Sequence, residues 1–164
     1  MSSWIGVIAA IVGAIVGGGI AIINTRFQLR EQRLRERNKL FLSKLEEIHE
    51  VLSQFKESYK SSIHERLLTA HGTENAEAEW VKVPNEKLSM LVNFYATELT
   101  EHLNNVKQAQ RDYSDILMKS VGFQHRSIST RKDTLNELFF AEEKIKQVCS
   151  KMQTEVVKSS KKYL

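Results

Sequence analysis

Twenty consecutive residues without a charge occupy positions 4–23, which read WIGVIAAIVGAIVGGGIAII. A helix needs about 20 predominantly apolar residues to cross the hydrocarbon core of a bilayer. The rest of the sequence has no apolar stretch of that length. The sequence therefore predicts a transmembrane segment at 1–24, with Trp4 at the outer interface, followed by a water-soluble portion.

The residues that follow this run set the expected topology. Two Glu residues offset six cations in the next stretch: Arg26, Arg30, Arg33, Arg35, Arg37 and Lys39. Positive charge marks the cytoplasmic side of a membrane helix, whereas a cleaved secretory signal has its positive charge in front of the apolar run. We therefore expect a single-pass protein of the cell inner membrane, with a basic juxtamembrane stalk at 25–39 and a cytoplasmic C-terminal domain.

Glycine and alanine gather on one face of the predicted membrane helix. They form two adjacent rows with i, i+4 spacing, one of Ala9, Gly13, Gly17 and Ala21, the other of Gly6, Ala10, Ala14 and Gly18. Glycine is frequent in membrane helices in general, but small residues on one face let two backbones approach closely. The pattern favours self-association into a homo-oligomer through this face.

Residues 40–164 show helical periodicity and no useful strand-like alternation. They predict an all-α fold, in which the transmembrane helix is followed by a cytosolic helical bundle with a long first helix. That helix continues from the membrane to Gly72, a second runs from near Pro84 to Gly122, and a third begins near Thr130 or Asp133.

Matching helix lengths predict an antiparallel three-helix bundle for residues 40–164. In that arrangement the 72–84 loop and the C-terminus lie far from the membrane, and the 122–132 loop faces it. The apolar stripe of the first helix has heptad spacing from the stalk into the bundle; it consists of Phe27, Leu34, Phe41, Leu45, Ile48, Leu52, Phe55, Tyr59, Ile63 and Leu67.

Catalytic and metal-binding motifs are absent from the sequence, which has no HExxH, paired CxxC, GxxxxGK[ST] or GxSxG. The five histidines have no metal-ligand spacing, and the lone Cys149 is expected to be a buried, inert thiol. Glu142 departs from the apolar stripe of the third helix; we interpret it as partly exposed, with a buried polar contact as the alternative. We expect no enzyme activity, no cofactor and no metal.

Two segments have the composition of an anion site, and the first is 123–132. It combines three cations with hydroxyl groups, has no acid and leads into a helix N-terminus, where free N–H groups and the helix dipole favour phosphate. An ordinary capped loop and contact with anionic lipid heads are the alternatives. The candidate ligand-binding residues are Phe123, His125, Arg126, Ser129, Thr130, Arg131 and Lys132.

The second segment, 80–87, also precedes a helix. Its candidate residues are Trp80, Lys82, Asn85 and Lys87, where Trp80 stacks on a base if exposed and otherwise fills the core. The net charge of +4 is concentrated beside the predicted membrane helix. Large nucleic acids are therefore not expected as partners, because they need an extended basic face.

A short glycine-rich membrane helix followed by a small helical domain without a catalytic motif resembles the small membrane effectors of bacterial antiphage defence. In size and organisation the chain is most similar to the membrane-anchored effectors of type III CRISPR systems that respond to cyclic tetra-adenylate. The resemblance implies a homo-oligomer that binds a cyclic oligoadenylate and then perturbs the bilayer. It assigns a role to no residue. A non-gated, membrane-tethered coiled-coil scaffold or assembly subunit that docks a protein partner is the alternative function.

Overall fold

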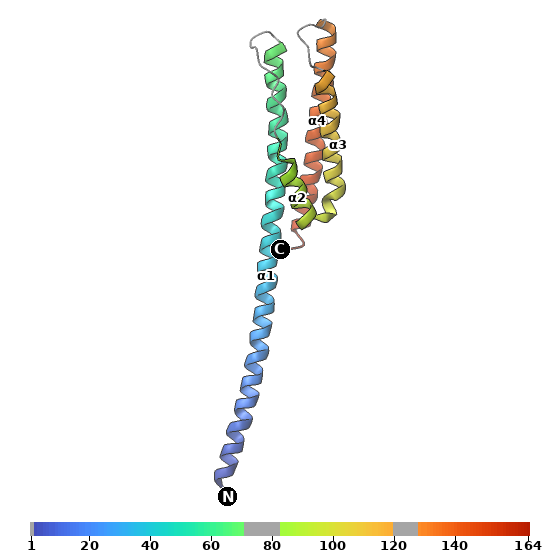
Figure 1. Cartoon of the computed structure of the whole chain (residues 1–164). Coiled ribbons are helices and arrows are strands. Elements are labelled where there is room, and N and C mark those ends of the chain that lie inside the picture. Colours follow the sequence, from blue (N-terminus) through green and yellow to red (C-terminus); the bar gives the residue numbers. More distant parts are fainter. Residues whose placement is uncertain (1, 71–82, 120–127) are drawn as a thin grey trace. The chain divides into compact units, whose positions relative to one another are not determined.

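The computed structural model describes residues 2–70, 83–119 and 128–164, and for 2–12, 14–17, 63–70, 128 and 131 it describes the backbone alone. All regular structure in these ranges is helical, which confirms the predicted all-α class (Figure 1). The chain divides into two compact units, Met1–Leu40 and Phe41–Leu164.

Helix α1 spans Ser2–Ala70 and contributes to both units. Within the described residues, no helix contains a stretch long and apolar enough to cross a bilayer. Most side chains of the predicted membrane segment at 1–24 lie outside the described residues. Its insertion into a membrane therefore stays a prediction from the sequence.

The expected second helix is in fact broken at Ala96. Helix α2 spans Asn85–Tyr95, a short 3-10 helix η1 covers Thr97–Leu99, and helix α3 spans Thr100–Lys119. Ala96 leaves the helical region at φ −148° and ψ 54°, although its N–H still donates to the Val92 carbonyl. The break reverses the chain, so that α2 and α3 both bury their leucines in one core.

The three-helix arrangement predicted from lengths is wrong, because this reversal adds a fourth segment. Helix α2 runs antiparallel to α1, since Lys87 pairs with Glu47 while Tyr95 lies against Phe41. Helix α3 then runs parallel to α1 and places its Tyr113 ring 4.9 Å from that of Tyr59 (Figure 1).

Helix α4, Ile128–Ser160, returns antiparallel to α1, and beyond its end Tyr163 stacks on Phe41 with the ring centroids 5.1 Å apart. The C-terminus therefore lies at the Phe41 end of this unit and not at the far end, as the helix lengths suggested. The end of α3 and the start of α4, which flank the undescribed residues 120–127, lie beside the end of α1 in this unit (Figure 1). Most of the predicted 122–132 loop lies outside the described residues, so its expected position facing the membrane stays a prediction.

Apolar side chains from all the helical segments of Phe41–Leu164 form one core. The predicted stripe of the first helix is confirmed from Leu45 to Tyr59, whereas its members Phe27 and Leu34 are exposed. The fully buried residues include Leu45, Ile48, Leu52 and Phe55 of α1, Leu88 and Leu91 of α2, Leu103, Val106 and Tyr113 of α3, and Leu138, Ile145, Cys149 and Met152 of α4.

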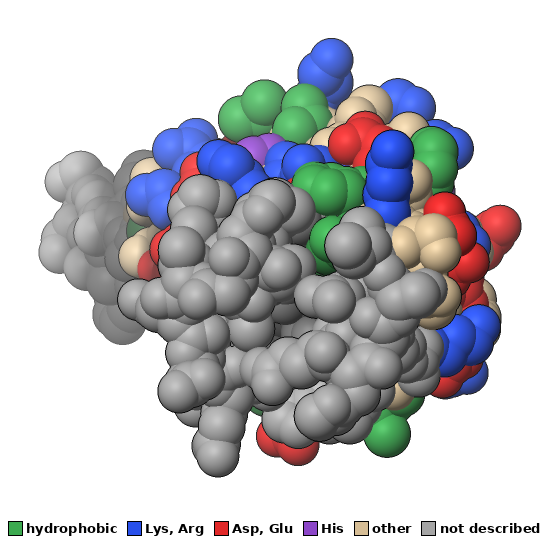
Figure 2. All heavy atoms as spheres, turned by 90° about the horizontal axis from the view of Figure 1, so that it is seen from above, with side chains coloured by type: hydrophobic (Ala, Val, Ile, Leu, Met, Phe, Trp, Pro, Cys, Tyr) green, Lys and Arg blue, Asp and Glu red, His purple; other side chains and the backbone are tan. Residues whose placement is uncertain are grey.

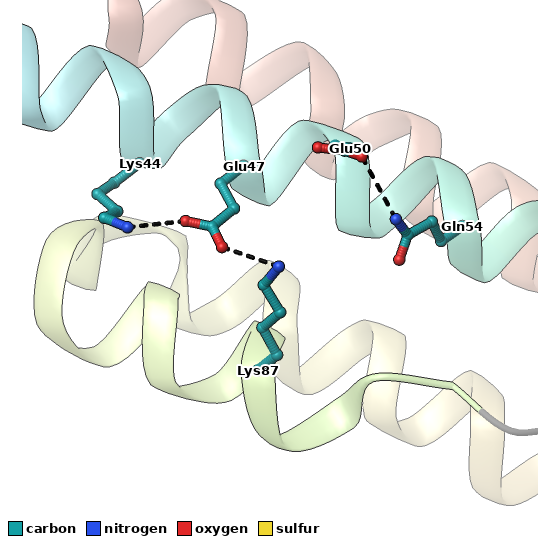
Figure 3. A network of polar contacts seen from close by, with 5 residues as sticks. All are labelled: Lys44, Glu47, Glu50, Gln54 and Lys87. Atoms are coloured by element: carbon teal, nitrogen blue, oxygen red, sulfur yellow. Dashed lines mark hydrogen bonds and ion pairs between the residues drawn. The ribbon is translucent and has the colours of Figure 1, made fainter.

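Glu47 on α1 joins two lysines at the surface of the core (Figure 3). Its carboxylate lies 2.8 Å from the ammonium of Lys44 on the same helix and 2.8 Å from that of Lys87 on α2. Hydrogen bonds from Lys44 and then Lys87 lower the pKa of Glu47 from its usual 4.5 to about 2. The folded state therefore stabilises the ionised form of Glu47 relative to the unfolded chain.

We expect Glu47→Gln to flatten the pH dependence of stability between about pH 4.5 and pH 2. A lowered folded-state pKa stabilises the fold above 4.5, and this stabilisation is lost as pH falls toward 2. The measurement is the urea midpoint of unfolding as a function of pH. Glu50→Gln is the matched control, because Glu50 lies one turn further along α1 and contacts Gln54 instead of a cation (Figure 3). Equal flattening in both variants would contradict the assignment.

Candidate functional site

The first predicted anion segment is described only in part. Phe123, His125 and Arg126 lie outside the described residues, as does the side chain of Arg131. Ser129, Thr130 and Lys132 are exposed, and they lie within the first turns of α4, which begins at Ile128. Helix α4 therefore begins slightly before the earlier of the two predicted starts, Thr130, and residues 128–132 belong to the helix.

The described residues of the second predicted segment, 80–87, have different surroundings. Trp80 and Lys82 lie outside the described residues. Lys87 points to α1, where it forms the ion pair with Glu47, so its charge already has a structural partner (Figure 3). Asn85 is exposed at the first residue of α2, where its N–H donates to the Val83 carbonyl at 2.8 Å.

An open hollow of about 410 Å³ connects Asn85 with one face of α3. Helical spacing brings the α3 residues to that face, because side chains three or four positions apart are neighbours on a helix. Asn85 at the start of α2 closes one side. The lining residues are Asn85, Lys107, Gln110, Arg111, Ser114 and Asp115.

A hydrogen-bonded layer inside the core supports the floor of this hollow. Gln110 is 8% exposed and donates its amide to the Tyr59 hydroxyl at 3.3 Å. The Tyr113 hydroxyl lies 3.4 Å from that of Ser62, within hydrogen-bond distance. Burial raises the pKa of Tyr59, which keeps its hydroxyl neutral. These buried contacts fix the rotation of α3 and therefore the direction of Lys107 and Arg111 on the same helix.

The hollow has two cations and one carboxylate. Among the described residues, no carboxylate lies within ion-pair distance of Lys107 or Arg111. By contrast, Asp112 on the neighbouring face binds Lys144 of α4 at 2.6 Å, and this hydrogen bond lowers the pKa of Asp112. The chemistry of the hollow is therefore that of a polar, weakly cationic surface with amide and hydroxyl donors, which suits an anionic oxygen ligand.

Protein-family models, curated proteins and solved structures give no match to this chain. A function must therefore be inferred from its own residues.

The described part of the chain offers little for metal binding or for thiol chemistry. No group of three or more His, Cys, Asp or Glu residues there lies close enough to hold a metal ion. Cys149 is fully buried, as predicted, and burial raises its pKa to about 11. Glu142 is buried and not partly exposed as interpreted above, and its carboxylate lies 2.7 Å from the Lys146 ammonium.

The predicted oligomerisation face is described at Gly13, Gly18 and Ala21, all of them exposed. A Cβ atom added at Gly13 or Gly18 would meet no atom within 4 Å, so the single chain leaves space there. The side chains of Ala9, Ala10 and Ala14, together with Gly6 and Gly17, lie outside the described residues. Self-association through this face stays a prediction.

Figure 2 shows Lys and Arg side chains interspersed with Asp and Glu side chains on the described part of the surface. Two aromatic side chains of this unit, Phe94 on α2 and Phe140 on α4, are more than 70% exposed. Monomeric proteins expose single apolar residues routinely, so each side chain alone indicates little.

Lys107, Arg111, Ser114 and Asp115 were missed by the sequence interpretation. Their spacing shows that they share a helix face. Nothing in the sequence indicates that this face meets Asn85, since that contact depends on the reversal at Ala96.

Proposed function

We propose that this chain is a homo-oligomeric, membrane-anchored effector whose helical unit binds a phosphate-bearing second messenger such as a cyclic oligoadenylate. Binding changes the arrangement of the membrane helices and perturbs the bilayer in antiviral defence. The layout of the chain motivates this function, together with the resemblance described above. The chain acts without catalysis or a cofactor.

The observation that carries the ligand-binding part is the hollow between Asn85 and α3. Arg111 offers a planar guanidinium and Lys107 an ammonium, and both groups bind phosphate oxygens. Amide groups of Asn85 and Gln110 and the Ser114 hydroxyl line the same space. We therefore place the ligand at this hollow in preference to the 123–132 segment, whose described residues do not line it.

The proposed ligand is tested by adding cyclic tetra-adenylate to the full-length protein in detergent and measuring thermal unfolding. A ligand that binds the folded state alone raises stability by about 2.7 kcal/mol at 100 times its Kd. Linear tetra-adenylate and inorganic phosphate are the controls for ring geometry and for charge. If none of these anions stabilises the protein, the second-messenger function fails.

Membrane anchoring is supported by the apolar run at 4–23 and by the six cations that follow it. We expect a C-terminal fusion to alkaline phosphatase, an enzyme that works only outside the cytoplasm, to be inactive in cells. A C-terminal fluorescent-protein fusion should be bright and should sediment with membranes after a carbonate wash. An active phosphatase fusion would contradict the predicted topology. Release of the fluorescent fusion by carbonate would contradict membrane anchoring.

A membrane-tethered scaffold that docks a protein partner is the second candidate function. The exposed aromatic rings of Phe94 and Phe140 favour it, because aromatic side chains are enriched at protein–protein interfaces. This function needs no response to a nucleotide. It predicts that Phe94→Ala or Phe140→Ala impairs biological activity while cyclic tetra-adenylate leaves the unfolding temperature unchanged.

A further inference from the structure

The part of α1 that precedes the bundle has an apolar face that is exposed among the described residues. Phe27 is 64% exposed and Leu34 is 51% exposed. This stretch also contains charges on all sides, which exclude it from the hydrocarbon core of a bilayer. An isolated helix of this length is only marginally stable in water, so helical structure here benefits from a packing partner.

Heptad spacing relates this face to residues whose packing is known. Phe27, Leu34 and Phe41 continue at intervals of seven into Ile48 and Phe55, which are fully buried. We label these the d positions. The a positions, four residues after each d, are occupied by Leu45 and Leu52 in the core, and both are buried. The a/d pattern of a packed helix therefore extends back along the sequence beyond the bundle.

The same labels also include two residues of each small-residue row of the predicted membrane segment. Counting back by heptads from Phe27 places Ile20, Gly13 and Gly6 at d, and Gly17 and Ala10 at a. A single seam therefore runs from the predicted membrane helix through the stalk. An interface between two copies is continuous along such a seam, because a supercoil keeps the a and d positions of both helices in contact.

Polar residues at the a positions within residues 24–40 specify the kind of partner. Asn24 and Asn38 occupy two of these positions, and asparagine at a fixes the register and oligomeric state of coiled coils. Glu31 occupies the third and lies 3.6 Å from Arg35 on its own helix. In a parallel pair, a residue at a also faces the preceding g position of the partner, so Glu31 meets Arg30 of a second copy. This contact offsets the repulsion between Arg30 and the partner's Arg35.

We propose that residues 24–40 form a parallel two-stranded coiled coil with the same residues of a second copy of this chain. Phe27 and Leu34 pack against their counterparts, and Glu31 of each helix lies between arginines of both helices. The inference shares with the proposed function only its self-association, and it holds whether or not the protein binds a nucleotide. Anchoring in one bilayer raises the effective concentration of the two stalks, which compensates for the short seam.

Single cysteine variants of the full-length protein test the pairing. Leu34→Cys and Phe27→Cys place thiols at facing d positions, where a disulfide forms when the Cα atoms are within about 7 Å. Leu29→Cys is the matched control, because Leu29 is 48% exposed but lies at an f position on the opposite side. Native Cys149 is buried and contributes little background. The protein is oxidised in membranes, and disulfide-linked dimer is quantified on denaturing gels.

We expect both d-position variants to form dimer about tenfold faster than Leu29→Cys, since facing thiols share a high effective concentration. Oligomeric mass is measured in parallel by cross-linking the wild type through its lysines. Equal rates for Leu34→Cys and Leu29→Cys would overturn the coiled coil even if the protein is still oligomeric. A cross-link between Cys at 27 of one copy and Cys at 34 of another, without either self-pair, would overturn the parallel orientation. If the wild type is monomeric in membranes, both the coiled coil and the proposed self-association are wrong.

Discussion

Replacing Phe55 with alanine is expected to lower the free energy of unfolding of the Phe41–Leu164 unit by about 3–5 kcal/mol. Phe55 lies on α1 and is 0% exposed, among Ile48, Leu52 and Tyr59 of the same helix and the core residues of α2, α3 and α4. Removing the ring loses its transfer free energy and leaves a cavity that rigid helices close only in part. Urea unfolding of the full-length protein, followed by circular dichroism, measures the loss.

Phe140→Ala is the matched control for this change. Phe140 is the same residue type on a helix of the same unit, but it is 78% exposed. Its replacement is expected to shift the unfolding free energy by less than about 0.5 kcal/mol. Because small domains are stable by only about 5–15 kcal/mol, Phe55→Ala removes a large share of the total. Equal effects of the two substitutions would show that the two rings do not differ in burial.

The core of this unit could be predicted from apolar spacing, because burial against a helical partner imposes the same period on every amphipathic helix. Leu45, Ile48 and Leu52 on α1 follow this period and are buried as expected. So do Ile145 and Met152 on α4. The spacing also led to the correct expectation for Cys149. Periodicity reports which side of a helix is buried, and it is insensitive to which neighbour buries it.

The break at Ala96 could not be predicted from the same signal. Leu91, Tyr95, Leu99 and Leu103 continue the i, i+4 spacing through the break without interruption. Neither glycine nor proline marks the site. The reversal is a tertiary effect. Because the chain turns between α2 and α3, both helices bury their leucines against α1 and α4, whereas one continuous helix would extend past these partners. The errors in the bundle topology and in the position of the C-terminus both follow from this residue.

The candidate site shows the same limit. Asn85 was selected as part of a segment that precedes a helix, and it does line the hollow. Lys87 was selected with it, but a side chain two residues further on points to a different face of α2 and pairs with Glu47. Lys107 and Arg111 lie more than twenty residues further along and become neighbours of Asn85 only through the fold. The composition of a sequence can identify segments that suit a ligand. Predicting a site formed between two helices also requires knowing how each helix is rotated about its axis.

Glu142 illustrates why an interrupted stripe was misinterpreted. A carboxylate on an apolar face is most often partly exposed, because burying a charge without a partner is costly. Here Lys146, one turn further along α4, reaches back to the buried carboxylate. The contact with Glu142 raises the pKa of Lys146, which keeps that partner charged. The i, i+4 spacing of the two residues was visible in the sequence and supplies the missing signal.

The double replacement Lys107→Ala and Arg111→Ala is expected to abolish most binding of cyclic tetra-adenylate. A hydrogen bond to a charged group contributes about 1.5–3 kcal/mol, so each cation accounts for one to two orders of magnitude in Kd. Neither side chain belongs to an ion pair among the described residues, and neither is buried, so the unfolding midpoint without ligand should stay unchanged. Lys161→Ala with Lys162→Ala removes the same charge from the exposed C-terminus and should bind as wild type.

Arg126→Ala with Lys132→Ala provides the decisive comparison, because it removes two cations from the other predicted segment. Isothermal titration of the full-length protein in detergent gives Kd for all three pairs under one salt concentration, since phosphate binding depends on screening. A loss confined to the Lys107 and Arg111 pair places the phosphate at the hollow. A loss confined to the Arg126 and Lys132 pair moves the site to the start of α4 and refutes the hollow. Equal, small losses in all three pairs indicate attraction by net charge alone, and the hollow is then no specific site.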